Sequence, residues 1–443
     1  MPFDLHDYRG PLGAIEPQLS RRRIAVAADD AGQLCLVRPD SVVLEFDEHG
    51  FEDVQRVISD ADLEVLGGPV TELPASGLLA ARPGKADRPD SLPERWSTAD
   101  LVPLAERFAD QRCTVRPNRV YLTEGVARHF RLVAENRPSR RPPHAIPAST
   151  SSTVRPAAEP SNLPAPLALP GHDAPDVLVL DTGLRTRDRR VAHPWLQDHC
   201  VLHSPWRDLK TVGRWDDEDE PDDDGGGRLD IQAGHGTFIS GVIRQQCPDA
   251  RIHHRGVLTS YGDGDDASIV AAIERAKADS EHHFDIVVMA FGAYATAGDP
   301  PPAATAVERL LGDSLVVASA GNDATSRPTY PAALPGVVAV GALDRAGRAA
   351  FSNFGPWVDA ATPGVDVVST FFDDVDDRDE QGELREQYRG WARWSGTSFA
   401  APKVAGVIAQ ELYLHGGTAH EAWARIRSRA GFRIPDLGVL VNC

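Results

Sequence analysis

Residues 395–402 read Ser-Gly-Thr-Ser-Phe-Ala-Ala-Pro, and Lys-Val-Ala-Gly-Val follows at 403–407. The alanine- and glycine-rich stretch predicts a helix that can pack close to a sheet. Ser398 would lie in the first turn, at the positive end of the helix dipole and among backbone N–H groups that have no partner within the helix. That position favours an oxyanion, although for the serine alone a plain N-cap is the better interpretation.

Two earlier segments carry the other candidate groups. The apolar run Val-Leu-Val-Leu at 177–180 ends at Asp181, and residues 234–241 read Gly-His-Gly-Thr-Phe-Ile-Ser-Gly. An aspartate at a strand end usually caps a helix or makes a turn, so Asp181 alone is a weak signal. A histidine between two glycines, as at His235, is poorly explained by packing.

Together these three segments resemble the subtilisin-like (subtilase) serine peptidases, whose triad follows the order Asp, His, Ser. The Gly-His-Gly-Thr and Gly-Thr-Ser-x-Ala-x-Pro signatures are highly specific, and the resemblance covers residues 176 to about 430. It implies a serine endopeptidase that works through an acyl-enzyme, with Asp181, His235 and Ser398 as its triad. Residues 316–322, Val-Val-Ala-Ser-Ala-Gly-Asn, match the segment that supplies an oxyanion donor in this family, so the resemblance gives that role to Asn322.

The resemblance also implies a cleft in which two extended segments hold a peptide as an added strand. One segment follows residues 257–258, and a small-residue pocket would lie beside the other. The implied substrate-binding residues are Gly262, Ala290, Phe291, Gly292, Ala318, Ser319, Ala320 and Gly321. The chain departs from the family at Val288, where asparagine is frequent, and at Phe238, where a second histidine is common. We expect altered packing or specificity there.

The fold class follows from apolar runs that alternate with amphipathic segments. Short β-branched runs predict strands buried on both faces, and the alternation predicts a three-layer α/β domain with a parallel sheet, of the subtilisin-like kind. The predicted strands are 177–180, 252–258, 286–290, 315–318 and 337–340, and the predicted helices are 237–246, 267–278 and 303–311.

The first 136 residues differ in character. A βαββαβ order predicts a small α+β domain that resembles the ferredoxin-like prodomains of subtilases, which fold beside the peptidase and plug its cleft. Its predicted strands are 41–46, 63–66, 77–81 and 112–115, and its predicted helices are 51–61 and 98–109. A Pro-rich linker follows at 137–175, and the peptidase domain is predicted at 176–443. A retained regulatory or partner-binding domain is the alternative, because a long linker replaces an immediate junction.

Composition limits the classes of partner. The chain has 443 residues, 42% of them apolar, and a formal net charge of -19. Such charge disfavours nucleic acid and anionic membranes as partners, and protein or peptide substrates are expected. No apolar run approaches the roughly 18 residues of a membrane helix, and the N-terminus does not read as a signal peptide. The five scattered cysteines favour reduced thiols, so we expect a cytoplasmic location.

Acidic residues gather in three places: 216–224, Asp263 with Asp265 and Asp266, and 371–380. Solvated loops, selection of Lys- or Arg-containing substrates, and structural calcium are all open interpretations, whereas the chemistry itself requires no cofactor. Two rivals to the peptidase are a catalytically silent peptide-binding scaffold and the serine-carboxyl peptidases. The latter use glutamate where this chain has His235.

Overall fold

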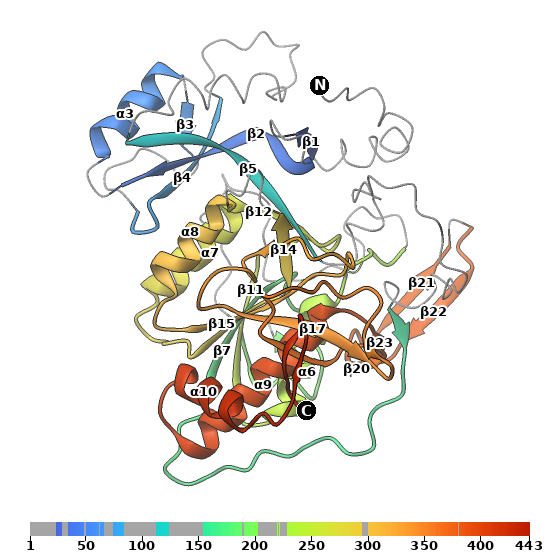
Figure 1. The fold of residues 1–443 in the computed structure, drawn as a ribbon. Helices are drawn as coiled ribbons and strands as arrows, with labels where there is room; N and C mark the ends of the chain where they lie inside the picture. Colours follow the sequence, from blue (N-terminus) through green and yellow to red (C-terminus); the bar gives the residue numbers. More distant parts are fainter. Residues whose placement is uncertain are drawn as a thin grey trace, which may run out of the picture.

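The computed structural model describes residues 24–28, 34–47, 50–61, 63–65, 74–83, 112–123, 154–187, 190–202, 219, 221, 228–294, 300–379 and 381–443. Residues from 154 onward build a layered body, and the preceding ones form a smaller region beside it (Figure 1). The predicted helix at 98–109 lies outside the described residues. Within the described part of the chain, no helix has the length and apolarity needed to cross a membrane.

The body is organised around a ten-stranded sheet with the order β10-β11-β7-β13-β15-β17-β19-β25-β24, and with β18 paired to β17. All neighbouring pairs from β10 to β25 are parallel, which confirms the predicted parallel sheet. The strands are β10 (Cys200–Leu202), β11 (Arg251–Gly256), β7 (Asp176–Asp181), β13 (Ile286–Met289), β15 (Leu315–Ser319), β17 (Val338–Asp344), β19 (Ala360–Pro363), β25 (Gly438–Leu440), β24 (Arg433–Ile434) and β18 (Gly347–Arg348).

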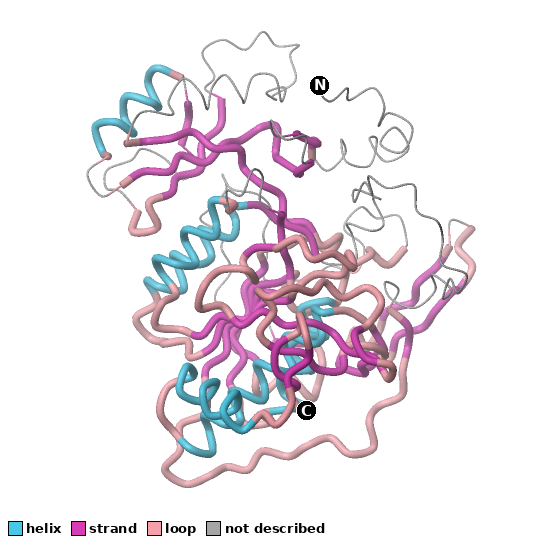
Figure 2. The backbone as a smooth tube through the Cα atoms, viewed as in Figure 1, coloured by secondary structure: helices cyan, strands magenta, loops and turns pink. Residues whose placement is uncertain are grey.

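Side chains alternate across this sheet and so divide into two cores. In β7, Val177 and Val179 join the core that contains residues of α6 and α9, whereas Leu178 and Leu180 join the core that contains residues of α7 and α8. Strand β7 is therefore apolar on both faces, as a strand covered by two helical layers requires. Figure 2 shows helices on either side of the central strands. The helices α6, α7, α8 and α9 span His235–Gln246, Asp266–Ala278, Pro302–Leu310 and Thr397–His415, and α10 (Ala419–Arg429) packs against α9.

The N-terminal region is the predicted small α+β unit. Its strands form an antiparallel sheet in the order β5-β2-β4-β3, with β1 beside β2. Helix α3 (Phe51–Asp60) buries Val54 and Val57 in a core shared with the strands. The strands β1 to β5 span Ala25–Ala28, Leu34–Phe46, Leu63–Val65, Leu78–Pro83 and Cys113–Thr123.

Strand β5 is longer than the predicted strand at 112–115, and it contains Pro117. Proline has no N–H to donate to a ladder and usually marks an edge or an irregularity. Here the register between β5 and β2 shifts between Val37 and Val42, opposite Pro117, and the strand then continues to Thr123.

The second half of β5 runs from the N-terminal region onto the body (Figure 1). There it pairs antiparallel with β12 (Asp263–Asp265) on one side and with β14 (Phe291–Tyr294) on the other. Strand β14 also pairs with β16 (Thr329–Tyr330). One sheet is thus shared between the N-terminal region and the body, with β5 as its connecting strand.

The described part of the predicted linker lies extended along the body (Figure 1). Strand β6 (Arg155–Pro156) pairs with β23 (Trp391–Trp394), which also pairs with β20 (Val367–Thr370). Further along, the Leu169 N–H donates to the Tyr413 hydroxyl at 2.7 Å. Two short antiparallel pairs complete the described strands: β8 with β9 (Thr186–Arg187 and Arg190–Val191) and β21 with β22 (Val375–Arg378 and Leu384–Tyr388).

Candidate active site

The predicted triad residues come from three separate elements at the carboxyl end of the parallel sheet. Asp181 ends β7, His235 begins α6, and Ser398 is the second residue of α9. His235 Nδ1 lies 2.7 Å from Asp181 Oδ1, and the two side chains are 2% and 0% exposed. The buried contact fixes the direction of the imidazole, because one ring nitrogen is held by the carboxylate.

Ser398 is connected to this pair through the next residue in the chain. Its neighbour Phe399 contacts the His235 imidazole, with ring centroids 5.3 Å apart. The Ser398 hydroxyl donates to the Ala290 carbonyl oxygen at 3.2 Å rather than to the imidazole. Hydrogen bonds between a serine and its base often form or tighten only when substrate is bound.

A second carboxylate, Asp219, is hydrogen-bonded to residues next to Asp181 and His235 in the chain. The Thr182 hydroxyl donates to Asp219 Oδ2 at 2.7 Å and accepts from the Gly236 N–H at 3.0 Å. The Gly234 N–H donates to the same Asp219 oxygen at 2.8 Å. Burial raises the pKa of Asp219 well above its ordinary value. Asp219 therefore joins the residue after Asp181 to both neighbours of His235.

Sequence reasoning missed this contribution. It placed Asp219 in the acidic run 216–224 and offered solvation, substrate charge or calcium as its role. Nothing in the sequence distinguishes Asp219 from the other carboxylates of the run, because its burial depends on a contact with Thr182, far earlier in the chain.

Aromatic rings surround the His235 imidazole. Trp394 meets it edge-on at a centroid distance of 5.5 Å, and Phe399 lies tilted against it. Phe238 stands where a second histidine is common in the family, and it is fully buried. Its ring centroid lies 4.6 Å from that of Phe399 and 5.8 Å from that of Trp394. Phe238 thus completes an apolar wall that keeps water from this side of the ring.

A second buried imidazole, His254 of β11, lies below the pair. Burial lowers the pKa of His254 to about 4, so this ring is neutral near pH 7. It explains why position 236 is glycine: a Cβ there would lie 2.7 Å from His254 Nε2 and 2.3 Å from the Gly183 carbonyl oxygen. The signature Gly-His-Gly is therefore a packing requirement as well as a turn.

Asn322 is held with its amide in one orientation. Its Oδ1 accepts from both the N–H and the hydroxyl of Thr397, each at 3.0 Å. The Nδ2 group is therefore left as a donor near the N-terminus of α9, beside Gly396. The preceding Gly321 has φ +112°, and a Cβ there would lie 2.0 Å from Asn353 Nδ2, so the turn requires glycine.

The residues predicted to bind substrate lie around the two strands that hold β5. Gly262 precedes β12, and its N–H donates to the Thr259 carbonyl oxygen at 2.7 Å. Ala290 separates β13 from β14, which contains Phe291 and Gly292. The pocket residues are the last two of the neighbouring strand β15 and the two that follow it, and all four are buried: Ala318, Ser319, Ala320 and Gly321.

Asp263 and Asp265 of β12 and Asp266 of α7 form ion pairs or hydrogen bonds with side chains of the N-terminal region. Arg38 of β2 donates from Nη2 to Asp263 at 2.9 Å and from Nε to Asp265 at 3.0 Å, in a buried cluster. Asp266 accepts from the Tyr121 hydroxyl of β5 at 2.9 Å. These acidic residues therefore have partners within the chain, and selection of basic substrates by them stays a prediction.

Metal ligation finds no support in the part of the chain that the structure describes, where no group of three or more His, Cys, Asp or Glu side chains is placed to hold an ion. Much of the acidic run 216–224 lies outside that part. The expectation of structural calcium stays a prediction.

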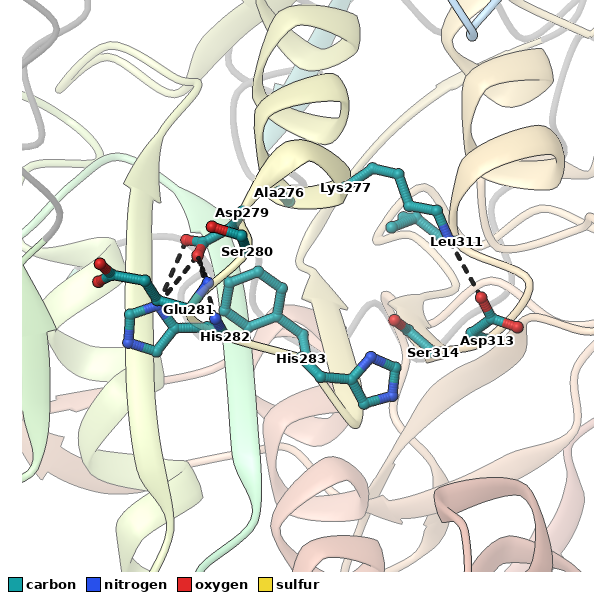
Figure 3. A pocket seen from close by; sticks show the side chains of 11 residues that line it. Ala276, Lys277, Asp279, Ser280, Glu281, His282, His283, Leu311, Asp313 and Ser314 are labelled. Atoms are coloured by element: carbon teal, nitrogen blue, oxygen red, sulfur yellow. Dashed lines mark hydrogen bonds and ion pairs between the residues drawn. The ribbon is translucent and has the colours of Figure 1, made fainter.

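A separate pocket of about 320 Å³ lies between the ends of α7 and α8, near the start of β13 and β15 (Figure 3). Two pairs of its side chains interact: Lys277 Nζ lies 3.0 Å from Asp313, and His282 Nδ1 lies 3.2 Å from Asp279. None of the predicted site residues lines this pocket. It is at the opposite end of the strands from Asp181.

Comparison with known proteins identifies relatives of the body. A model described as the Subtilase family matches residues 173–430. A thermophilic serine proteinase from a Bacillus species is 31% identical over 255 residues, which cover 54% of this chain and 52% of that protein. A thermostable alkaline protease from Halalkalibacterium halodurans is 33% identical over 186 residues, 40% of this chain and 46% of that protein.

The chain thus spans about half the length of the curated relatives it matches. Among solved structures, a cold-adapted subtilisin-like serine proteinase is 22% identical with a TM-score of 0.47, covering 65% of this chain and 94% of that one.

Proposed function

The chain belongs to the subtilase family, and we propose that it is a serine endopeptidase in which Ser398 attacks the peptide carbonyl. The observation that carries this proposal is the buried 2.7 Å contact between His235 and Asp181 beside the serine at the start of α9. A serine hydroxyl is a poor nucleophile at neutral pH, so a base must accept its proton during attack. His235 Nε2 is the ring nitrogen that Asp181 leaves available.

In the proposed reaction, His235 accepts the hydroxyl proton as the bond between Ser398 Oγ and the carbonyl carbon forms. The imidazolium then donates that proton to the leaving amine, and water repeats the sequence to release the acyl group. Asp181 keeps the imidazole in the tautomer with hydrogen on Nδ1 and stabilises its positive charge. The hydrogen bonds of Asp219 with Thr182 and Gly234 keep Asp181 and His235 in position.

The developing oxyanion requires donors near the N-terminus of α9. We assign this role to the Ser398 backbone N–H and to Asn322 Nδ2, because Thr397 occupies the other end of the Asn322 amide. Donors held in place before the reaction need no reorganisation, and loss of one typically lowers turnover by about 10²- to 10³-fold.

The N-terminal region is proposed to inhibit this site in cis. Strand β5 lies where a substrate added between β12 and β14 would lie, so both cannot occupy the cleft together. Release of β5, with or without cleavage of the chain, would then be the activating event.

The test is covalent labelling by a fluorophosphonate probe, followed by mass spectrometry of the labelled peptide. We expect labelling at Ser398 in the wild-type chain, none in Ser398→Ala, and strongly slowed labelling in His235→Ala. Peptide binding without labelling, under conditions where β5 has been displaced, would favour the catalytically silent scaffold.

A further inference from the structure

The side chain of Tyr121 is buried against residues of the body. It is 2% exposed, its ring meets Phe291 edge-on at a centroid distance of 5.8 Å, and its hydroxyl donates to Asp266 Oδ1. Edge-to-face contact and a hydrogen-bonded hydroxyl together suit a phenol better than any other natural side chain.

Asp266 is a fully buried carboxylate with three donors. The Ala303 N–H, from the first turn of α8, belongs to the body, whereas the Arg119 N–H and the Tyr121 hydroxyl both belong to β5. A substrate chain in the place of β5 could replace the Arg119 N–H with any backbone N–H. It could replace the Tyr121 hydroxyl only with a side-chain donor. An apolar side chain would remove one of the two donors to Asp266 Oδ1 and leave that oxygen with the Ala303 N–H alone, which is costly in a buried site.

We propose that Asp266 and Phe291 form a subsite that selects tyrosine in the substrate, and that Tyr121 fills it in the resting protein. This inference rests on the proposed peptidase function. Sites built to hydrogen-bond a substrate hydroxyl reject analogues that lack it far more strongly than apolar pockets reject an extra group.

The ladder gives the position of this tyrosine relative to the bond that is cut. Tyr121 lies opposite Gly264, and the next two residues of β5 lie opposite Gly292 and Phe291. In this antiparallel register, the substrate residue opposite Ala290 comes three positions after the tyrosine. Because the Ala290 carbonyl oxygen is 3.2 Å from Ser398 Oγ, that residue is the one whose carbonyl is attacked.

The test uses the full-length protein and internally quenched peptides with the sequence of residues 118–125, Asn-Arg-Val-Tyr-Leu-Thr-Glu-Gly, or with phenylalanine in place of tyrosine. We expect kcat/KM to be higher for the tyrosine peptide by about 10-fold or more. Mass spectrometry should place the cut after the third residue beyond the tyrosine.

In Asp266→Asn the ratio of the two kcat/KM values should fall to within about 3-fold of one, whereas Asp313→Asn, in the distant pocket, should keep the wild-type ratio. Equal rates for both peptides in the wild-type chain, with hydrolysis dependent on Ser398, would overturn the subsite and leave the peptidase proposal standing.

If no peptide is cut, fluorophosphonate labelling of Ser398 distinguishes a failed peptidase proposal from a cleft that β5 still occupies, and the subsite is tested by itself in a Ser398→Ala chain. Hydrogen exchange at β5 amides is measured for Tyr121→Phe, Asp266→Asn and the double variant. We expect Tyr121→Phe to speed exchange by about 10-fold when Asp266 is present and by less than about 3-fold in Asp266→Asn. Equal effects in both backgrounds would overturn the proposed contact.

Discussion

Replacement of Arg38 by methionine should release β5 from the cleft. Arg38 is the cation that joins Asp263 and Asp265 across the interface, and the three side chains are 11%, 2% and 11% exposed. Methionine fills a similar volume but leaves two buried carboxylates without this partner. Removal of one member of a buried ion pair typically costs about 3–5 kcal/mol.

The expected loss is somewhat smaller than that range. Asp265 keeps the Ser268 N–H at 3.0 Å and hydroxyl at 2.9 Å, and both carboxylates regain water when β5 leaves. We therefore expect docking, rather than folding of the body, to weaken by about 2–4 kcal/mol, or roughly 30- to 1000-fold.

The assay is hydrogen exchange in a Ser398→Ala chain, which prevents cleavage. Amides of β5 should exchange at least about 30-fold faster in Arg38→Met. The matched control is Arg82→Met: Arg82 pairs with Glu64 inside the N-terminal region at 3.0 Å, with both side chains more than 30% exposed. Equal exchange at β5 in the two variants would refute the role of Arg38 in docking.

Three further outcomes follow from the contacts around the site. Gly236→Ala should lower the melting temperature and the rate of Ser398 labelling, because the added methyl overlaps the His254 ring and forces a backbone shift worth about 1–3 kcal/mol. Asp219→Ala should lower kcat by about 10-fold with little change in KM, since it positions other groups and does not touch substrate; an equal change in KM would contradict this. Thr418→Ala should cost about 1 kcal/mol in thermal unfolding and leave peptidase activity unchanged, because it removes only the capping box of α10.

The sheet and the signature segments could be predicted because their signals are local. The runs at 177–180, 286–290 and 315–318 are apolar at every position, as strands covered on both faces must be. The segment around His235 combines a reactive group with a glycine that packing requires, because a Cβ at Gly236 would overlap the nearby His254 ring.

The supporting residues could not be predicted because their partners are distant in sequence. Asp219 acts through Thr182, and Asp266 binds Tyr121 across more than a hundred residues. The length of β5 was also missed, because its second half is stabilised by β12 and β14 rather than by its own sequence pattern. Proline at position 117 disfavours a strand locally, and the pairing with distant strands outweighs that preference.

Strands β5 and β6 have a consequence for how the protein would be purified. Residue 123 is held in one ladder and residue 155 in another, and both ladders belong to the same body. A single backbone break between them would leave each fragment hydrogen-bonded in place. Such a nicked protein would elute from a sizing column as one species and separate into two bands only in denaturant, so native size does not report whether the polypeptide is intact.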